Sequence, residues 1–528
     1  MSQHHMDRLS AIDASFLHQE GPSTHMHIGG VAIFDGDPPT REEFLEHVRS
    51  RLPLVPRYRQ KIGTPPLGLG RQRWVDDPAF HLDYHVRQTA LPAPGDEEQI
   101  RRLAARIFSQ RLDRSRPLWE MWLVEGLSRG RFAIISKVHH SLVDGVAGAD
   151  LMTVLFDITP VPGRPELPDA WQPRPEASPV ELGAATLNDV TGALVRLPLR
   201  LAAAAAQPGR TLAEARDVLA GVGEIVLAGL TSPAPDTPLN LTIGPHRRVA
   251  FVPAALDDFK AIKDAFGGTV NDVVLAVVAG AMARFFHSRG LRVEGLELRA
   301  AIPISVRGRD DGSALGNRIT QVTSPLPIYV SDPVERLRRV RREMDGIKES
   351  KQALGAEAIA GAEDFAPPTI LAQASRLNFS SRFYNLLVTN VPGPQFPLYV
   401  MGRELRSMFP VAFLAGDRAL AIAIMSYNGG MNFGLIGDYD SLPDIDVIAA
   451  GIEDALGELL ALARAQAPAR RRQRRRPPAR ASGRRERAGA SGRRDRARAP
   501  RQSAPAGAAA TPSPTGDGHP PTLEPRRA

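Results

Sequence analysis

The sequence contains no cysteine in its 528 residues. This absence excludes disulfide bonds, thiolate metal sites and a cysteine nucleophile, and it is compatible with a reducing cytoplasm. Long apolar runs are also scarce. The longest, Val273–Phe286, is interrupted by Gly280 and Arg284 and is shorter than the roughly 18 residues that a membrane-spanning helix needs. The first residues lack the basic region and apolar run of a signal peptide, so the sequence predicts a soluble or peripheral protein.

Basic residues are unevenly distributed along the chain. The net charge is +8, yet residues 467–528 hold 17 arginines, no lysine and four acidic residues. The remaining residues carry a small excess of acidic groups, so we expect no nucleic-acid partner for the folded part. Residues 467–528 have almost no large apolar side chains, which predicts a disordered tail. Such a tail either attracts anionic lipid headgroups, at roughly 1 kcal/mol per basic residue near the surface, or is a solvated extension.

The length predicts at least two domains. In residues 1–160, apolar β-branched and aromatic residues predict strands at Ile28–Phe34 and Phe132–Val138. Apolar residues at helical spacing predict helices at Arg41–Leu52 and Glu97–Gln110. Residues 1–160 are therefore predicted to form a first α/β unit.

Two further segments complete the body of the chain. Residues 161–240 begin with many prolines and continue at helical spacing, which predicts a connector and bridging helices that pack against the body or dock on lipid. Residues 241–466 are predicted to form a second α/β unit, so the predicted fold class is α/β with mixed sheets. Its predicted helices are Val270–Phe286 and Ile445–Ala463, and its predicted strands are Leu298–Pro303, Leu386–Val391, Leu420–Tyr427 and Met431–Ile436.

One segment carries a pattern that suits acid–base chemistry. The predicted strand Phe132–Val138 runs into His139 and His140, and Asp144-Gly145 follows after three residues. Neighbouring strand residues point to opposite faces, so only one of the two histidines is expected to face a given cavity. Histidine titrates at about pH 6.5, which suits proton abstraction near neutral pH. A buried Asp144 needs a partner such as an arginine, and the pair would then hold the loop.

A metal site is an alternative for these residues, because two histidines and an aspartate can all be ligands. Adjacent strand histidines diverge, however, and no further cluster of cysteine or histidine completes a coordination shell. The pair of histidines after an apolar strand, with Asp-Gly at this spacing, therefore favours a catalytic role over a metal site or a structural histidine.

The pattern His-His-x-x-x-Asp-Gly resembles the active-site motif of the CoA-dependent acyltransferase superfamily. Over about residues 7–462 the chain is similar to the bacterial wax ester synthase/diacylglycerol acyltransferase family, of the actinobacterial kind. The segments that carry this resemblance are Leu9–Leu17, Met26–Gly30, Pro117–Glu120, Gly268–Val273, Pro303–Arg307, Leu315–Arg318, Asn390–Pro394 and Ser426–Gly429. Two features depart from the family: Leu241-Thr242 stands where Gly-Pro is usual, and the basic tail is additional.

The resemblance implies a fold and a set of catalytic roles. The fold would be two chloramphenicol-acetyltransferase-like lobes with a tunnel between them and the histidine motif at its middle. His140 would be the general base that removes a proton from an alcohol, and His139 would support it. The resemblance assigns Asp144 to holding the loop and Gly145 to the tight turn.

Other motif residues have two readings each. Asn271 is a candidate hydrogen-bond donor to the developing oxyanion, or it simply N-caps the helix that follows. Pro117, Leu118 and Trp119 would shape the acyl channel or pack in the core. Asn390–Pro394 is predicted to form a rigid turn.

The implied reaction transfers a long-chain acyl group from acyl-CoA to diacylglycerol, giving triacylglycerol, or to a fatty alcohol, giving a wax ester. No covalent intermediate and no cofactor are expected, since acyl-CoA is a substrate. The implied location is cytoplasmic, peripheral to the inner membrane face or to lipid droplets. Two alternatives are a condensation-type acyltransferase acting on another acceptor and a non-catalytic peripheral lipid-binding protein.

Overall fold

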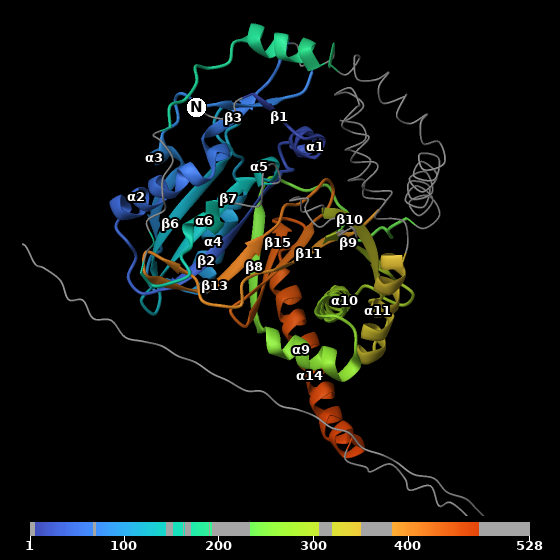
Figure 1. The fold of residues 1–528 in the computed structure, drawn as a ribbon. Helices are drawn as coiled ribbons and strands as arrows, with labels where there is room; N and C mark the ends of the chain where they lie inside the picture. The colour runs from blue at the N-terminus through green and yellow to red at the C-terminus, as the bar shows by residue number, and fades with distance from the viewer. Residues whose placement is uncertain are drawn as a thin grey trace, which may run out of the picture. The chain divides into compact units, whose positions relative to one another are not determined.

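The computed structural model of the chain describes residues 6–66, 70–143, 151–161, 163, 171–189, 191–192, 233–305, 319–349 and 383–474. Two six-stranded sheets organise these residues (Figure 1). The strands of the first sheet, in chain order, are β2 (His27–Asp35), β5 (Val86–Ala90), β6 (Trp119–Leu127), β7 (Arg131–His139), β12 (Tyr399–Val400) and β13 (Arg403–Val411). Their spatial order is β12-β13-β2-β7-β6-β5, which places β7 in the interior of the sheet.

The second sheet is built from later segments of the chain. Its strands are β8 (Arg247–Ala255), β9 (Leu298–Ser305), β10 (Ile319–Leu326), β11 (Leu386–Pro392), β14 (Leu420–Tyr427) and β15 (Gly430–Asp438). They lie in the order β10-β9-β11-β14-β15-β8, with parallel pairing of β11 to β9 and to β14. A smaller sheet in the order β1-β4-β3 consists of β1 (Asp7–Arg8), β3 (Gln60–Gly63) and β4 (Arg73–Asp76).

Helices surround the sheets, and several begin at capping boxes that the sequence specifies. The helices are α1 (Ala11–Gln19), α2 (Arg41–Arg51), α3 (Leu82–His85), α4 (Glu97–Phe108), α5 (His140–Val143), α6 (Leu151–Leu155), α9 (Leu256–Phe266), α10 (Val270–Ser288), α11 (Pro333–Glu349) and α14 (Ile445–Arg474), with 3-10 turns at Leu52–Leu54 and Pro56–Arg59. Reciprocal side-chain-to-backbone bonds cap α2 at Thr40, α4 at Asp96 and α10 at Thr269, and they satisfy N–H groups that the helix itself leaves unpaired.

Most of the strands and helices expected from the sequence are present at the expected places. The predicted strands near residues 28 and 132 are β2 and β7, the predicted helix near residue 270 is α10, and the α/β fold class is confirmed. The closing helix α14 is longer than predicted: it continues to Arg474, past the expected start of the tail at residue 467. Alanine, arginine and glutamine dominate those residues and are strong helix formers, which explains the extension. Residues 475–528 and most of the predicted bridging helices lie outside the described residues.

The two sheets exchange a segment of chain. Strands β12 and β13 belong by sequence to the second predicted unit, but β13 pairs antiparallel with β2, from Leu405 opposite Phe34 to Val411 opposite Gly29. The two sheets therefore do not correspond to the chain segments before and after residue 240. The exchange lets β13 cover the edge of β2 that β7 leaves open, and exposed strand edges are otherwise sites for unwanted pairing.

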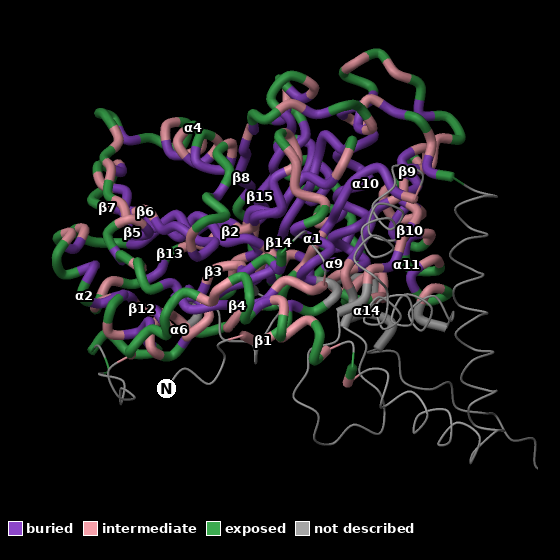
Figure 2. Tube along the Cα trace, turned by 90° about the horizontal axis from the view of Figure 1, so that it is seen from above, coloured by how far each residue is buried: buried purple, intermediate pink, exposed green. Residues whose placement is uncertain are grey.

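The two sheets share part of their core, and a second apolar cluster lies mainly on the first sheet. Figure 2 shows buried residues following the strands of each sheet, and one apolar cluster joins side chains from the two sheets. Phe409 of β13 stacks on Phe251 of β8, with ring centroids 4.5 Å apart. Gly434 of β15 makes this approach feasible, because a Cβ at this position would lie 1.7 Å from the carbonyl oxygen of Pro410.

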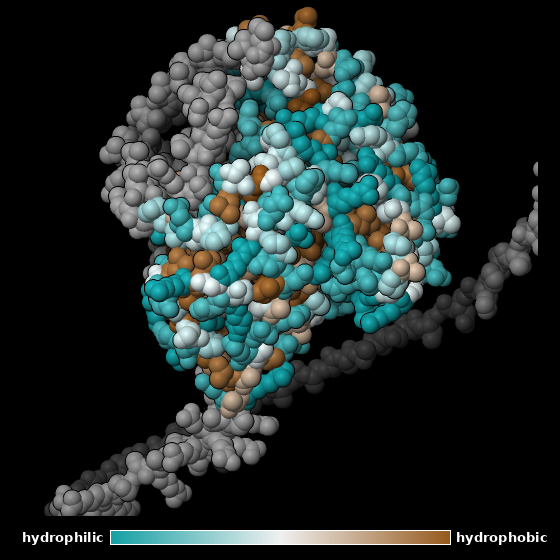
Figure 3. All heavy atoms as spheres, turned by 180° about the vertical axis from the view of Figure 1, so that it is seen from behind, coloured by the Kyte–Doolittle hydropathy of each residue, from teal (hydrophilic) through white to brown (hydrophobic). Residues whose placement is uncertain are grey.

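Helix α10 lies in this core. Among the described residues, α10 alone has the length and apolar composition of a helix that could cross a membrane. In its most apolar 18-residue stretch, however, 78% is buried inside the protein. Such burial is expected for the central helix of an α/β core. On the face drawn in Figure 3, hydrophobic side chains form small patches between hydrophilic ones, as is normal for a protein surface.

Candidate active site

The turn that carries the two histidines is fixed from both sides. Strand β7 ends at His139, and α5 begins at His140. The backbone N–H of His139 donates to the carbonyl of Leu118, at 2.9 Å, and that of His140 donates to the carbonyl of Met26, at 2.8 Å. The neighbouring chain segments before β2 and β6 therefore hold the point at which β7 changes into a helix.

His139 is enclosed in the protein. It is 1% exposed, and its Nδ1 accepts a hydrogen bond from the backbone N–H of Ser141 at 3.2 Å and lies 2.7 Å from the Ser141 hydroxyl oxygen. Burial, with the charge of Arg114 and the neighbouring His140, lowers the pKa of His139 to about 3. The ring is therefore neutral at physiological pH, and because Nδ1 is the acceptor its proton lies on Nε2.

His140 has a different environment. Its residue is only partly buried, and its ring stacks on Phe16 of α1 at a centroid distance of 4.1 Å. Its ring is also perpendicular to that of Phe413, which follows β13, with 5.4 Å between the ring centroids and 89° between the ring planes. Two apolar rings thus restrict the orientation of this imidazole while part of the residue stays accessible.

The cause of the divergence of the two histidines differs from the sequence-based argument. Alternation along a strand was expected to separate them, but only His139 belongs to the strand, and His140 begins a helical turn. Residues 141–143, expected to be loop, belong with His140 to α5. Asp144 and Gly145 lie outside the described residues, so their predicted roles stay predictions.

Pro117, Leu118 and Trp119 lie beside this turn and are buried. The indole Nε1 of Trp119 donates to the carbonyl of Tyr58 at 2.7 Å, and its ring stacks on His85 at 4.6 Å. Leu118 is fully buried in the core of the first sheet. These contacts support the core-packing interpretation, and the acyl-channel interpretation stays a prediction.

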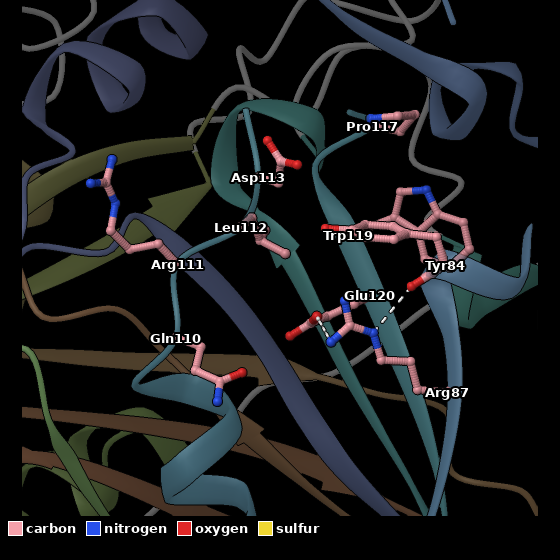
Figure 4. A pocket seen from close by; sticks show the side chains of 9 residues that line it. All are labelled: Tyr84, Arg87, Gln110, Arg111, Leu112, Asp113, Pro117, Trp119 and Glu120. Atoms are coloured by element: carbon pink, nitrogen blue, oxygen red, sulfur yellow. Dashed lines mark hydrogen bonds and ion pairs between the residues drawn. The ribbon is translucent and has the colours of Figure 1, made fainter. Parts of the chain in front are cut away.

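A cavity of about 230 Å³ lies next to these residues (Figure 4). Its lining is largely polar or charged and consists of Tyr84, Arg87, Gln110, Arg111, Leu112, Asp113, Pro117, Trp119 and Glu120. Arg87 points to Glu120, with 3.4 Å between Nη1 and Oε2, and donates from Nε to the carbonyl of Tyr84 at 3.1 Å. A polar lining does not match a channel for an acyl chain.

Asn271 does not cap its helix. Thr269 is the N-cap of α10 and forms a capping box with Asp272, so the capping interpretation of Asn271 is wrong. The spacing Thr-x-x-Asp before an apolar run was a signal that would have identified the cap. Within the described residues, the side-chain hydrogen bond of Asn271 joins its Oδ1 to Nδ2 of Asn390 at 3.3 Å, not to the histidine turn. Its amide N–H₂ group is thereby turned away from Asn390, and the oxyanion role stays a prediction.

Three motifs of the second half of the chain, which contain Asn271, Asn390–Pro394 and Ser426–Gly429, are in contact. Gly393 N–H donates to the carbonyl of Ser426 at 2.9 Å, and Asn428 N–H donates to the carbonyl of Pro394 at 3.0 Å. Strand β11 extends through Pro392, so three of the five residues of the predicted rigid turn, Asn390–Pro394, are strand instead. The Asn390–Pro394 segment, the Asn428 segment and Asn271 are linked by these hydrogen bonds.

Glu20 is a site residue that the sequence-based reasoning did not identify. Its side chain is 1% exposed at the end of α1, and its Oε2 lies 4.0 Å from Nε2 of His139. Among the described ranges, no group of three His, Cys, Asp or Glu side chains is placed to share a metal ion. Asp144, one member of the metal alternative, is outside those ranges.

Comparisons with known proteins agree over most of the chain. The family profile described as the wax ester synthase/diacylglycerol acyltransferase catalytic domain matches residues 9–274, and that of the WS/DGAT C-terminal domain matches residues 315–460. The probable diacylglycerol O-acyltransferase tgs1 of Mycobacterium tuberculosis is 34% identical over 478 residues, which cover 88% of this chain and 98% of that protein.

Two solved structures have a similar fold. The wax ester synthase/diacylglycerol acyltransferase from Marinobacter aquaeolei VT8 is 26% identical with a TM-score of 0.63, and the match covers 87% of this chain and all of that one. The first condensation domain of the calcium-dependent antibiotic synthetase has a TM-score of 0.55 over 87% of this chain and 96% of its own. At 15% identity, this second likeness concerns the fold alone.

Proposed function

This chain belongs to the wax ester synthase/diacylglycerol acyltransferase family, and we propose that it transfers long-chain acyl groups from acyl-CoA to diacylglycerol, giving triacylglycerol. The chain is an acyltransferase that shares nearly the full length of a relative named for this reaction. Formation of wax esters from fatty alcohols is a second reaction for the same site, in line with the name of the family and of the Marinobacter enzyme.

The unequal placement of the two histidines carries the proposed mechanism. His140 is partly accessible between Phe16 and Phe413, whereas His139 is buried with Nδ1 already engaged. We assign His140 as the general base. It takes the proton of the acceptor hydroxyl while that oxygen attacks the thioester carbonyl. The C–S bond then breaks, the proton passes to the CoA sulfur, and no acyl-enzyme forms because both substrates meet at one site.

The developing oxyanion needs a donor. Asn271 is our candidate, since its bond to Asn390 engages the amide oxygen and leaves the N–H₂ group to donate. The backbone around Asp144-Gly145 would complete the turn after α5, with Asp144 paired to an arginine. Acyl-CoA enters as a substrate, so the reaction requires no cofactor.

The experiment that tests this function is transfer of labelled palmitoyl from palmitoyl-CoA to dioleoylglycerol or hexadecanol. We expect ester formation by the wild type and a loss of about 10²–10⁴-fold in His140→Ala, the contribution of a general base. His81→Ala, which changes an exposed histidine of the same half of the chain, is the matched control and should retain activity. Full activity in His140→Ala would overturn the assigned base.

The better acceptor distinguishes triacylglycerol from wax ester synthesis. Activity confined to carrier-bound acyl groups would favour a condensation-type reaction. No transfer to either acceptor, by wild type and variant alike, would favour a lipid-binding protein without catalysis.

We also propose a cytoplasmic protein that binds peripherally to the inner membrane face or to lipid droplets. Diacylglycerol resides in membranes, and the 17 arginines of residues 467–528 suit anionic headgroups. Flotation with vesicles containing phosphatidylserine tests this. Deletion of residues 475–528, which hold 13 of these 17 arginines, should weaken salt-sensitive binding, and unchanged binding would remove the tail from the proposal.

A further inference from the structure

Glu20 is a buried carboxylate at the histidine turn. It is the C-terminal capping residue of α1, and its side chain is 1% exposed. Its Oε2 lies 2.7 Å from Nε of Arg114, and its Oε1 lies 3.6 Å from Nε of Arg111. Two arginines from the segment between α4 and β6 therefore lie against this buried carboxylate and offset its charge.

The same carboxylate faces His139, with 4.0 Å between Oε2 and Nε2. Nδ1 of His139 accepts from the N–H of Ser141, so Nε2 carries the proton of the neutral ring. Across the described residues, that buried N–H has no hydrogen-bond acceptor within bonding distance. A buried donor without an acceptor is costly, and the Glu20 carboxylate is about 1 Å too far for an N–H···O bond.

We propose that Glu20 is a positioning residue for the reaction: its carboxylate, 4.0 Å from Nε2, attracts the Nε2–H of His139 and so orients the ring, whose Nδ1 is held by Ser141. The orientation of the His139 ring affects His140 through the backbone of the turn that connects them. Nδ1 of His139 holds the N–H of Ser141, and Ser141 lies in the helical turn that begins at His140. Helix α1, which ends at Glu20, also supplies Phe16 against the His140 ring. This inference rests on the proposed role of His140 as the base.

The competing explanation is that Glu20 only ties α1 to the α4–β6 segment through its arginines. That role predicts lower stability and an effect on activity independent of His139. A positioning role predicts that loss of Glu20 lowers kcat only when His139 is present. A displacement of about 1 Å at a reacting group is enough to lower the rate about 100-fold.

The test is a double-mutant cycle on kcat for palmitoyl transfer with Glu20→Leu, His139→Gln and their combination. We expect Glu20→Leu to lower kcat about 10–100-fold while KM for palmitoyl-CoA changes less than about 3-fold. The combined variant should be no slower than His139→Gln alone, since both changes remove the same support for His140. Losses that multiply, or a kcat of Glu20→Leu equal to that of the wild type, would overturn the proposal.

A matched control is Asp157→Leu, which breaks the buried ion pair of Asp157 with Arg51, 2.7 Å in length, in the same half of the chain. It should lower the thermal midpoint of unfolding and leave kcat unchanged, which separates loss of a buried pair from loss of positioning. If Asp157→Leu lowers kcat as much as Glu20→Leu does, general destabilisation explains both results and the proposal fails.

A readout that needs no activity separates failure of this proposal from failure of the proposed function. In ¹⁵N-histidine-labelled protein, the signal missing from His139→Gln identifies the Nε2–H of His139. We expect that proton to resist exchange with water in the wild type and to exchange faster in Glu20→Leu. Equal exchange in both would refute the contact even if acyl transfer is confirmed. Slowed exchange in the wild type alone would support it even if the substrate proves different.

Discussion

The buried ion pair of Lys137 and Glu120 offers a quantitative test of how the first sheet supports the histidine turn. Lys137 lies two residues before His139 and is 1% exposed, and its Nζ pairs with Glu120 on the adjacent strand. The same Nζ donates to the carbonyls of Ile107 and Gln110, both at 2.9 Å. Burial lowers the pKa of Lys137, and Glu120 opposes that shift.

Lys137→Met removes the charge and three interactions but fills most of the space. Glu120 then stays buried, with Arg87 at 3.4 Å as its remaining cationic partner. Removal of one partner of a buried ion pair lowers the free energy of unfolding by about 3–5 kcal/mol. Because Arg87 stays beside Glu120, we expect a loss near the lower end, about 3 kcal/mol. In Lys137→Met combined with Glu120→Leu no buried charge is stranded, because Arg87, which loses Glu120, is 31% exposed. We therefore expect the double variant to recover about 1–2 kcal/mol relative to Lys137→Met.

Equilibrium unfolding in urea, followed by tryptophan fluorescence, measures this difference. The four tryptophans are at positions 74, 119, 122 and 171, so their emission reports on the half of the chain that contains the pair. Equal slopes with shifted midpoints identify changes in stability. A loss below about 1 kcal/mol in Lys137→Met, or a double variant less stable than both single ones, would refute the reasoning.

Three further predictions concern the same region and the contact between the sheets. Trp119→Phe deletes the hydrogen bond from the indole to the carbonyl of Tyr58 and should lower the free energy of unfolding by about 1–2 kcal/mol. KM for palmitoyl-CoA should stay unchanged, and a KM raised more than about 5-fold would favour the acyl-channel role. Gly434→Ala forces a methyl group against the carbonyl oxygen of Pro410 and should lower the free energy of unfolding by about 1–3 kcal/mol in the same urea assay. An unchanged unfolding midpoint would contradict the close approach of the two strands. His139 has a pKa of about 3 in the folded protein, whereas in the unfolded chain it binds a proton near pH 6.5. The free energy of unfolding should therefore fall as the pH drops from about 6.5 to 4.5, and His139→Gln should make this fall less steep. Equal slopes in wild type and variant would argue against the buried neutral ring.

Local patterns in the sequence were sufficient for the elements around the histidines. The apolar run that becomes β7 predicted a buried strand, and the motif residues place His139 and His140 at its end. The capping box at Thr269 was also readable, although Asn271 was taken as the alternative cap. These features depend on residues within a few positions of each other, which is why spacing reveals them.

Contacts between distant segments were not predictable in this way. Nothing in the pattern of β13 indicates that β2 is its partner, because either sheet would accept a strand with those residues. Glu20 is similar: its partners Arg111 and Arg114 lie in another segment, and an acidic residue after a helix is usually a solvated one. The interpretation of Trp119 also depended on Tyr58, whose carbonyl only the fold brings to the indole.

The pairing of β13 with β2 has a consequence for biosynthesis. Strand β2 ends at Asp35 and β13 begins at Arg403, so about 370 residues must be translated before the first sheet can acquire its outer strands. At 5–20 residues per second this takes roughly 20–70 s, during which one side of β2 has no partner from its own chain. A nascent chain in this state presents a strand edge that another chain can bind. The topology therefore leaves this edge of β2 open to pairing with other chains until Arg403–Val411 has been synthesised.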